Sequence, residues 1–510
     1  MNSSLNAPRR ARDLDALAGE TVDVLVVGGG ITGVGVALDA ASRGLSVALA
    51  ERGDLAQGTS RWSSKLVHGG LRYLASGDVG LAYESAVERG ILLGRTAPHL
   101  VRPLATVLPL APATSTVDAR LTRAGLAAAD LLRRAAGTPG RVLPRSRRVG
   151  PAAASRLVPA VDTAGLRGAL VWWDGQLTDD AALVVAVART AASYGARILT
   201  RVEARDVTGD GATLVDRRTG AALAVRARSV IGATGVWAGE LDPDVVLRPS
   251  RGTHLVVPSA LLGGLPAALT VPYPGERNRY VFALPAGGGR AYVGLTDDPA
   301  EFPGEADPAP GPSDVDTLLG AVNAVLAVPL TPGHVLGTFT GLRPLLAGDG
   351  AGGRSADLSR RHAVRIGSTG VATVVGGKLT TYRRMAEDAV DTVVAARRLR
   401  AGRGHTRDLP LVGAAPLPVL RRVPAPERLV RRYGTEAPRV LGADDRPLAT
   451  GVEVTAAEVR FAARHEGALD AGDVLHRRTR IGLVPADAAA CRPAVEELLA
   501  NVPELKGFAS

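Results

Sequence analysis

The sequence predicts an α/β protein that begins with a strand–helix–strand unit. Residues 22–27 are continuously apolar, which is typical of a strand that is buried on both faces. Residues 45–50 repeat this pattern, and the stretch between the two strands has helical character and ends at Gly44. Two buried strands joined by one helix predict a parallel sheet.

Three glycines and one acidic residue give this unit its chemistry. Gly28 permits a tight turn, Gly30 lets a pyrophosphate approach the backbone, and Gly33 lets the helix and strand pack closely. The N-terminus of the helix then presents free N–H groups to phosphates. Glu51 ends the second strand, where its carboxylate accepts hydrogen bonds from ribose hydroxyls. The unit predicts a dinucleotide site and leaves NAD and FAD as alternatives.

Later segments continue the α/β pattern. We expect helices over residues 80–95, 117–136, 183–195 and 381–398, strands over 225–235 and 371–375, and a hairpin over 278–296. Residues 298–313 form a proline-rich loop, residues 401–426 are rich in proline and glycine, and residues 427–505 have helical patterns without obvious strands.

Composition excludes several classes of protein. Among 510 residues, 46% are hydrophobic and 22% are charged, which predicts packed domains rather than disorder. The single cysteine, Cys491, excludes an intramolecular disulfide and a cysteine-rich metal site, and we predict no metal. No apolar run approaches the ~20 residues of a membrane span. Residues 1–20 have no apolar core typical of a signal peptide. We expect a cytoplasmic protein, either free or lying on the inner face of the cell membrane.

The net charge of +11 comes almost entirely from arginine, because the chain has only three lysines. Aromatic residues make up 3%, which argues against nucleic acid as a partner. Another interpretation is an anionic membrane surface, since arginines surround the apolar helix predicted over residues 117–136. The residues of this cluster are Arg120, Arg123, Arg133, Arg134, Arg141, Arg145, Arg147 and Arg148, with Leu121, Leu126, Leu131 and Leu132. A solvated face of an arginine-rich protein is the alternative.

Residues 58–74 decide between the nucleotides. Their sequence, GTSRWSSKLVHGGLRYL, places four hydroxyls, a lysine and a histidine just after the second strand. This segment resembles the FAD-dependent glycerol-3-phosphate dehydrogenases. Four further segments resemble the same family in the same order: ATGVW at 233–237, RGTHLVVP at 251–258, GLRPL at 341–345 and GGKLTTYR at 376–383. RRTRIG at 477–482 is similar to the family's C-terminal helical domain.

The resemblance implies a fold and a set of boundaries. The fold is an FAD-binding, Rossmann-like domain of the glutathione-reductase and D-amino-acid-oxidase type, with an inserted strand-rich substrate domain and a C-terminal helical domain. The oxidoreductase region is expected at 20–400, with a discontinuous FAD domain at about 20–100, 165–248 and 336–400 and a substrate domain at about 101–164 and 249–335. Residues 401–426 are expected to be a linker and residues 427–510 the C-terminal domain.

The resemblance also implies FAD as the cofactor. The expected cofactor-binding residues are Gly28, Gly30, Gly33, Glu51, Thr59, Ser60, Ser64, Lys65, His68, Gly70, Ala233, Gly235, Gly377, Leu379 and Thr380. The backbone amides of Leu379 and Thr380 begin a predicted helix. We expect that N-terminus to stabilise negative charge at the flavin N1/C2=O edge.

Four residues are expected to be catalytic in the oxidation of sn-glycerol 3-phosphate to dihydroxyacetone phosphate. A hydride would pass from C2 of the substrate to flavin N5 while His254 takes the hydroxyl proton. Arg72 and Arg343 would hold the phosphate and an oxygen of the substrate, and Lys378 would add positive charge at the flavin. The structural alternatives are a packed core histidine for His254, a salt bridge for Arg343 and a helix-capping segment for Lys378.

Several functional alternatives stay open. The resemblance implies a quinone as electron acceptor, whereas an oxidase of the same family would use oxygen. A flavin-dependent oxidase of amines or hydroxy acids would share the fold and need no substrate phosphate. A non-catalytic flavin-bearing scaffold is the alternative from another class. The sequence also leaves the oligomeric state open, with a homodimer as one alternative.

Overall fold

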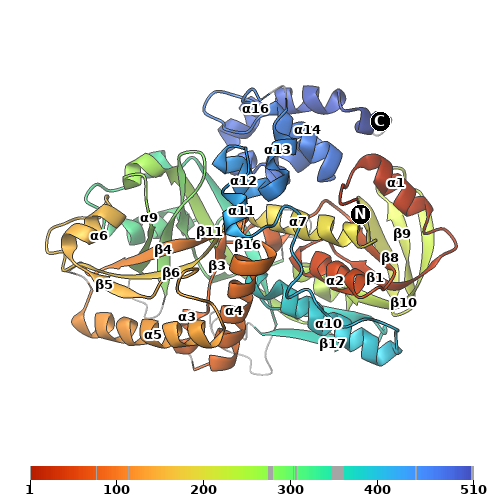
Figure 1. Cartoon of the computed structure of the whole chain (residues 1–510), viewed down its shortest axis with the longest axis horizontal. Helices are drawn as coiled ribbons and strands as arrows, with labels where there is room; N and C mark the ends of the chain where they lie inside the picture. The colour runs from red at the N-terminus through yellow and green to blue at the C-terminus, as the bar shows by residue number, and fades with distance from the viewer. Residues whose placement is uncertain are drawn as a thin grey trace.

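The structure is a computed structural model that describes residues 2–75, 77–112, 114–273, 279–302, 304, 307–346, 361–442 and 445–506. Its principal strands form two sheets, and the C-terminal helices lie on one long side of the molecule, at the top of Figure 1. The α/β fold class is confirmed, and so is a helical C-terminal domain.

The first sheet contains the predicted strand–helix–strand unit. β1 (Thr21–Val27) pairs in parallel with β2 (Val47–Glu51), and α2 (Ile31–Ser42) connects them. The strand order is β17–β18–β10–β1–β2–β7, and β17 is antiparallel to β18 while the other pairs are parallel. The remaining bounds are β7 Arg197–Thr200, β10 Ala222–Gly232, β17 His362–Ile366 and β18 Ala372–Gly376. β1 is central, which explains why its sequence is apolar on both faces.

The two faces of this sheet are covered differently. On one face α2 packs beside α7 (Asp180–Ser193) and α10 (Tyr382–Arg397), and their side chains form one core with the strands. On the other face β8 (Val202–Thr208) and β9 (Gly211–Asp216) form an antiparallel extension of β10 whose apolar residues pack against β1. The carboxyl ends of β1 and β2 therefore open at one edge, where Gly28 and Glu51 lie.

The second sheet has the order β15–β11–β14–β13–β12–β4–β6–β3, with β16 paired to β11 and β5 paired to β6. Its bounds are β3 Leu66–Val67, β4 Val101–Pro109, β5 Arg147–Val149, β6 Ala169–Leu177, β11 Leu247–Pro258, β12 Ala268–Pro272, β13 Tyr280–Pro285, β14 Arg290–Gly294, β15 Asp298–Pro299 and β16 Gly337–Leu346. The predicted hairpin is confirmed as β13 and β14. β3, β6 and β16 lie within the ranges expected for the FAD domain, and all three pair in this second sheet.

Helices flank the second sheet. α6 (Pro151–Leu157) and α9 (Asp314–Asn323) pack on its apolar core, and α5 (Thr116–Ala135) packs Leu126 against Leu108, Leu110 and Leu170. α5 lies along the lower left of Figure 1. Two helices, α3 (Leu71–Ala75) and α4 (Val79–Ile91), connect the loop after β3 to β4.

The C-terminal helices share a core with the start of the chain. Their bounds are α11 Leu417–Leu420, α12 Glu427–Tyr433, α13 Ala437–Val440, α14 Ala456–His465, α15 Ala471–Asp473 and α16 Pro485–Ala500. α1 (Ala7–Asp15), which the sequence did not reveal, buries Ala7 in this core. The predicted linker is not a free tether, since Leu409 and Leu411 are buried in the core beside α2 and α7.

Candidate active site

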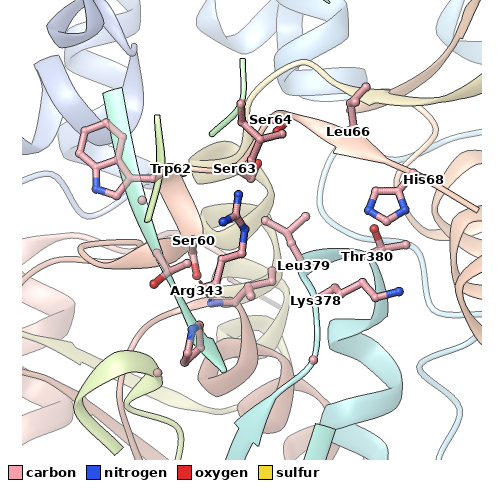
Figure 2. Close-up of a pocket in the computed structure, with 18 of the residues that line it drawn as sticks. Ser60, Trp62, Ser63, Ser64, Leu66, His68, Arg343, Lys378, Leu379 and Thr380 are labelled. Atoms are coloured by element: carbon pink, nitrogen blue, oxygen red, sulfur yellow. Dashed lines mark hydrogen bonds between the residues drawn. The ribbon is translucent and has the colours of Figure 1, made fainter. Parts of the chain in front are cut away.

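One large cavity lies between the two sheets. It has a volume of about 1800 Å³ and is lined from the carboxyl ends of β1 and β2 to the inner face of the second sheet. Most of the predicted site residues line it: Gly28, Gly30, Glu51, Thr59, Ser60, Ser64, His68, Ala233, Gly235, His254, Arg343, Gly377, Lys378, Leu379 and Thr380. Figure 2 labels ten of the lining residues, which come from segments far apart in the sequence.

The glycines at one end of the cavity are required by their surroundings. Gly28 has φ +111°, and a Cβ there would lie 2.6 Å from the carbonyl oxygen of Ala233. A Cβ on Gly33 would overlap the carbonyl oxygen of Gly28. Gly33 does not line the cavity; it lets α2 pack against the turn, which is the role that the glycine spacing predicts.

Glu51 is fixed beside these glycines. Its two carboxylate oxygens accept hydrogen bonds from the backbone N–H groups of Gly29 at 2.6 Å and Gly53 at 2.7 Å. Burial raises the pKa of Glu51, and the two N–H donors oppose that shift. The carboxylate therefore stands at the end of β2 with a defined orientation, as a ribose acceptor requires.

The N-terminus of α2 faces the cavity. Its cap residue is Gly30, which has no side chain to bind the free N–H groups, and the Ser60 hydroxyl accepts from the N–H of Ile31 at 2.9 Å. Thr59 donates its hydroxyl hydrogen to the carbonyl of Leu342 at 2.7 Å, which ties the loop after β2 to β16. Backbone donors at a helix N-terminus suit a pyrophosphate.

Lys65 differs from the expectation. The sequence predicts it as a cofactor contact, but it is buried and is not part of the described cavity lining. Its ammonium lies 3.2 Å from the carboxylate of Asp180 and donates to the carbonyls of Arg61 at 3.2 Å and Ser63 at 2.9 Å. Burial lowers the pKa of Lys65 to about 8, although Asp180 opposes the shift. Lys65 therefore holds the backbone of this loop through hydrogen bonds made inside the protein.

His254 lies in β11, is almost fully buried and lines the cavity. Its Nε2 lies 2.8 Å from the Ser64 hydroxyl oxygen, and its Nδ1 is buried without a hydrogen-bond partner among the described residues. Burial lowers the pKa of His254 well below its usual value, and the positive charges of Lys65 and Arg343 lower it further. The imidazole is neutral near pH 7, which is the form that accepts a proton.

Arg343 lies in β16, opposite Ser250 of β11. Its Nη1 donates to the Ser250 hydroxyl and to the Asp297 carboxylate, each at 3.0 Å, and its Nη2 donates to the carbonyl of Thr296 at 3.3 Å. The structural alternative of a salt bridge is therefore realised, yet the side chain also lines the cavity at the centre of Figure 2. Asp297, which sequence reasoning missed, fixes one edge of the guanidinium.

Lys378 follows Gly376 and Gly377, which have φ +74° and +75°. Its ammonium donates to the Ser85 hydroxyl at 2.7 Å and lies 3.7 Å from the centre of the Tyr73 ring. Leu379 and Thr380 begin a short 3-10 turn (Leu379–Thr381) that leads into α10, so their N–H groups lie at a helical N-terminus, as predicted. Figure 2 shows Lys378 pointing toward the same side of the pocket as His68.

The remaining predicted residues are placed less directly. Arg72 lies in α3, and its side chain lies outside the described part of the structure. Gly70, with φ +78°, is not part of the described lining.

Sequence reasoning also missed Asp174, whose carboxylate lines the cavity and pairs with Arg89. No sequence signal marks Asp174 or Asp297, because neither belongs to a recognised motif.

Comparison with known proteins assigns the family. The family described as FAD dependent oxidoreductase matches residues 23–383, and the C-terminal domain of alpha-glycerophosphate oxidase matches residues 404–506. Glycerol-3-phosphate dehydrogenase 1 of Mycobacterium tuberculosis is 53% identical over 515 residues, covering 98% of this chain and 99% of that protein. The chain belongs to the FAD-dependent glycerol-3-phosphate dehydrogenase family.

Other members of this dehydrogenase family extend the comparison. The probable mitochondrial glycerol-3-phosphate dehydrogenase of Dictyostelium discoideum is 33% identical, covering 92% of this chain and 78% of that protein. The solved structure of the Bacillus halodurans enzyme complexed with FAD has a TM-score of 0.73 and 25% identity, covering 99% of this chain and 96% of that chain. L-α-glycerophosphate oxidase of Mycoplasma pneumoniae shares the fold, with a TM-score of 0.56 and 19% identity, covering 76% and 98% of the two chains.

The residues present fit the family's cofactor, FAD. The cavity joins the free N–H groups of α2 and the acceptor Glu51 at one end to the turn at Lys378–Thr380 at the other. The first end suits a pyrophosphate and ribose, and the second suits a flavin ring that gains negative charge on reduction. FAD is therefore the cofactor of this dehydrogenase family member, as the sequence predicted.

Proposed function

We propose that this protein oxidises sn-glycerol 3-phosphate to dihydroxyacetone phosphate and passes the electrons to a quinone. The observation that carries the proposal is a buried, neutral histidine, His254, in the same cavity as two cationic side chains, Arg343 and Lys378. A neutral base and fixed positive charge suit an anionic alcohol as substrate. The names of relatives that are 53% and 33% identical support the same substrate.

His254 serves as the base in this proposal. Its Nε2 faces the hydroxyl of Ser64, and both residues line the cavity. We assign Nε2 as the atom that receives the substrate hydroxyl proton, directly or through the Ser64 hydroxyl. The depressed pKa keeps this nitrogen unprotonated before substrate binds.

Arg343 and Lys378 bind the anionic part of the substrate. Asp297 and Ser250 hold one edge of the Arg343 guanidinium, so the side chain reaches the cavity in a single orientation. A guanidinium presents paired N–H donors to a phosphate. Lys378, which follows β18 of the first sheet, adds a point charge. The resemblance also implies Arg72 for this anion site; the residue lies on α3, and its side chain is outside the described structure.

FAD, when bound, supplies the hydride-accepting chemistry, and the chain supplies position and electrostatics. The N–H groups at Leu379 and Thr380 would face the end of the flavin where negative charge develops. Glu51 and the turn at Gly28 and Gly30 would hold the nucleotide portion.

The quinone and the membrane surface are proposed from α5. Val117 and Leu121 of α5 are 62% and 66% exposed and also line the cavity, and Leu131 continues the apolar side chains along the helix. The surrounding cluster has exposed Arg120, Arg123, Arg134, Arg141, Arg145, Arg147 and Arg148, whereas Arg133 is buried and donates to the carbonyl of Thr138. An apolar, arginine-flanked cavity edge suits an anionic leaflet and an apolar electron acceptor. Within the described residues, no helix is long and apolar enough to cross a membrane.

The first test is an anaerobic titration of the purified holoprotein. Adding sn-glycerol 3-phosphate should bleach the absorption band of oxidised flavin, and a quinone analogue should restore it. A band that stays oxidised would contradict the substrate. The oxidase alternative, which the structural likeness to glycerophosphate oxidase keeps open, predicts rapid reoxidation by air with peroxide formation.

Sedimentation with vesicles containing anionic lipid tests the membrane surface, and equal binding to neutral vesicles would contradict it.

A further inference from the structure

The C-terminal domain reaches into the cofactor loop through Arg480. Its Nη2 donates to the backbone carbonyl of Arg61 at 2.5 Å, although the two residues are 419 positions apart in the sequence. Its Nη1 donates to the carbonyl of His476 at 2.6 Å, within the C-terminal domain itself. Arg480 therefore joins the two domains through one guanidinium.

The same carbonyl of Arg61 is the centre of a charged cluster. Lys65 donates to it from the other side of the loop, at 3.2 Å. Asp180 of α7 lies 3.2 Å from the Lys65 ammonium and 4.0 Å from the Arg480 guanidinium, and Asp179 lies 3.7 Å from Arg480. Burial would raise the pKa of Asp180, but Lys65 and Arg480 outweigh it, so the pKa is lowered and the carboxylate stays ionised.

This cluster fixes the part of the loop that faces the cavity. The Asp180 carboxylate accepts from the backbone N–H of Ser63 at 2.9 Å and from its hydroxyl at 2.7 Å. The next residue, Ser64, places its hydroxyl oxygen 2.8 Å from Nε2 of His254. Trp62, Ser63 and Ser64 all line the cavity, while Arg480 is not part of its described lining.

Arg480 is suited to hold a position rather than to bind a ligand. Its side chain is 8% exposed, and its guanidinium also lies 5.2 Å from the centre of the Trp62 ring. Its backbone has φ +62°, in the left-handed region that is uncommon for residues other than glycine. A buried guanidinium on an unfavourable backbone is costly unless its hydrogen bonds are well matched. Here Nη1 and Nη2 donate to main-chain carbonyls on both sides of the domain boundary, whereas Nε has no hydrogen-bond partner among the described residues and lies 3.7 Å from the Asp179 carboxylate.

We propose that Arg480 is a positioning residue that acts from the C-terminal domain on the contact between Ser64 and His254 in the active site. It holds the carbonyl of Arg61 and thereby the turn that carries Ser63 and Ser64. Loss of Arg480 would release the Ser64 hydroxyl from His254 without removing any group that contacts substrate. This inference rests on the proposed role of His254.

The experiment compares Arg480→Ala and Arg480→Lys with Arg492→Ala as a matched control. Arg492 lies in the same C-terminal domain and pairs with Glu496 on the surface, far from the loop in sequence. In the full-length holoprotein, hydrogen–deuterium exchange of the peptide covering residues 58–66 should rise in Arg480→Ala and stay at the wild-type level in Arg492→Ala. Arg480→Lys, which keeps a donor for the Arg61 carbonyl, should lie between them.

A second readout uses the FAD-loaded protein. A misplacement of about 1 Å near the chemistry lowers rates by about 100-fold, so anaerobic flavin reduction in Arg480→Ala should slow by about 10- to 100-fold while FAD stays bound. Arg480→Lys should recover part of the rate.

Wild-type exchange and wild-type reduction in Arg480→Ala would overturn the proposal. If Arg480→Ala fails to fold, Arg480→Lys decides, and faster exchange of residues 58–66 is then required. A wild-type flavin that sn-glycerol 3-phosphate does not reduce would contradict the proposed function instead, and the exchange experiment would still test Arg480.

Discussion

The imidazole of His254 lies flat against the ring of Phe339. The ring centres are 4.5 Å apart and the planes differ by 5°. The ammonium of Lys65 lies 4.1 Å from the centre of the same Phe339 ring. Phe339 thus removes water from the histidine, and a buried cation lies close by. Both effects disfavour the imidazolium, so they keep His254 in its neutral form.

The position of His254 predicts both the size and the pH dependence of its contribution. His254→Gln keeps hydrogen-bonding groups but removes the base, and we expect flavin reduction by substrate to slow by about 10²- to 10⁴-fold. In the wild type the base is active above its folded pKa and is lost as the pH falls through it. Because that pKa is lowered, the acid limb of the rate should lie well below pH 6.5.

The pH profile has an internal control. The substrate phosphate has its own ionisation near pH ~6, and a limb due to phosphate should persist in His254→Gln, whereas a limb due to His254 should vanish. Stopped-flow reduction of the flavin without oxygen measures both. A His254-dependent limb at or above pH 6.5 would contradict the desolvation of the imidazole seen in the structure.

Arg343 should matter for the substrate and not for cofactor retention. A charge-assisted hydrogen bond is worth about 1.5–3 kcal/mol, so Arg343→Ala should lower kcat/KM by about 10- to 150-fold while the flavin absorbance per protein is unchanged. Arg248 lies on β11 and is exposed, so Arg248→Ala is the matched control and should retain activity. Steady-state kinetics with the holoenzymes measure the effect, and wild-type kinetics in Arg343→Ala would remove its assigned role.

Gly33 should be required in the cofactor domain because its surroundings leave no space for a Cβ atom. A Cβ there would overlap the carbonyl oxygen of Gly28, so Gly33→Ala should displace the turn that faces the pyrophosphate. We expect loss of bound FAD and a lower melting temperature. Gly320→Ala is the control, since Gly320 lies in α9, where an added Cβ would meet nothing within 4 Å, and alanine favours helix. Flavin content and thermal unfolding test the pair of variants.

Asp54 should hold the C-terminal domain to the cofactor domain. Arg478 donates two hydrogen bonds of 2.8 Å to its carboxylate, Arg477 donates a third of 2.7 Å, and all three side chains are buried. Asp54→Asn removes the carboxylate that pairs with Arg478 and leaves Arg477 paired with Asp473 alone, so the free energy of unfolding should fall by about 3–5 kcal/mol. Asp13→Asn, which removes the i,i+4 pair with Arg9 in α1, should change it by less than about 1 kcal/mol.

The stability difference at Asp54 has a defined pH range. Burial alone would raise the pKa of Asp54, but Arg478 and Arg477 lower it below its usual value of 3.8. The ion pair therefore contributes in full above the unfolded pKa and is lost as the pH falls toward the folded pKa. The difference between wild type and Asp54→Asn should stay constant from about pH 5 to about pH 8. A difference that changes within that range would show that another group is responsible.

Features with a local cause could be predicted from the sequence alone. Residues 22–27 had to be a strand buried on both faces, and the spacing of Gly28, Gly30 and Gly33 required a tight turn against a helix, because backbone sterics act over a few residues. The hairpin at β13 and β14 follows for the same reason, from its glycine-rich turn.

The surroundings of each candidate side chain depend on the tertiary structure. Ser64 and His254 are 190 residues apart, and their contact depends on the loop after β2 meeting β11 of the other sheet. Lys65 shows the difference most directly: its motif predicts a cofactor contact, and Asp180 of α7 instead holds it inside the loop. Burial and charge pairing depend on which segments meet in space, and those terms set the pKa of His254 and the position of Arg480.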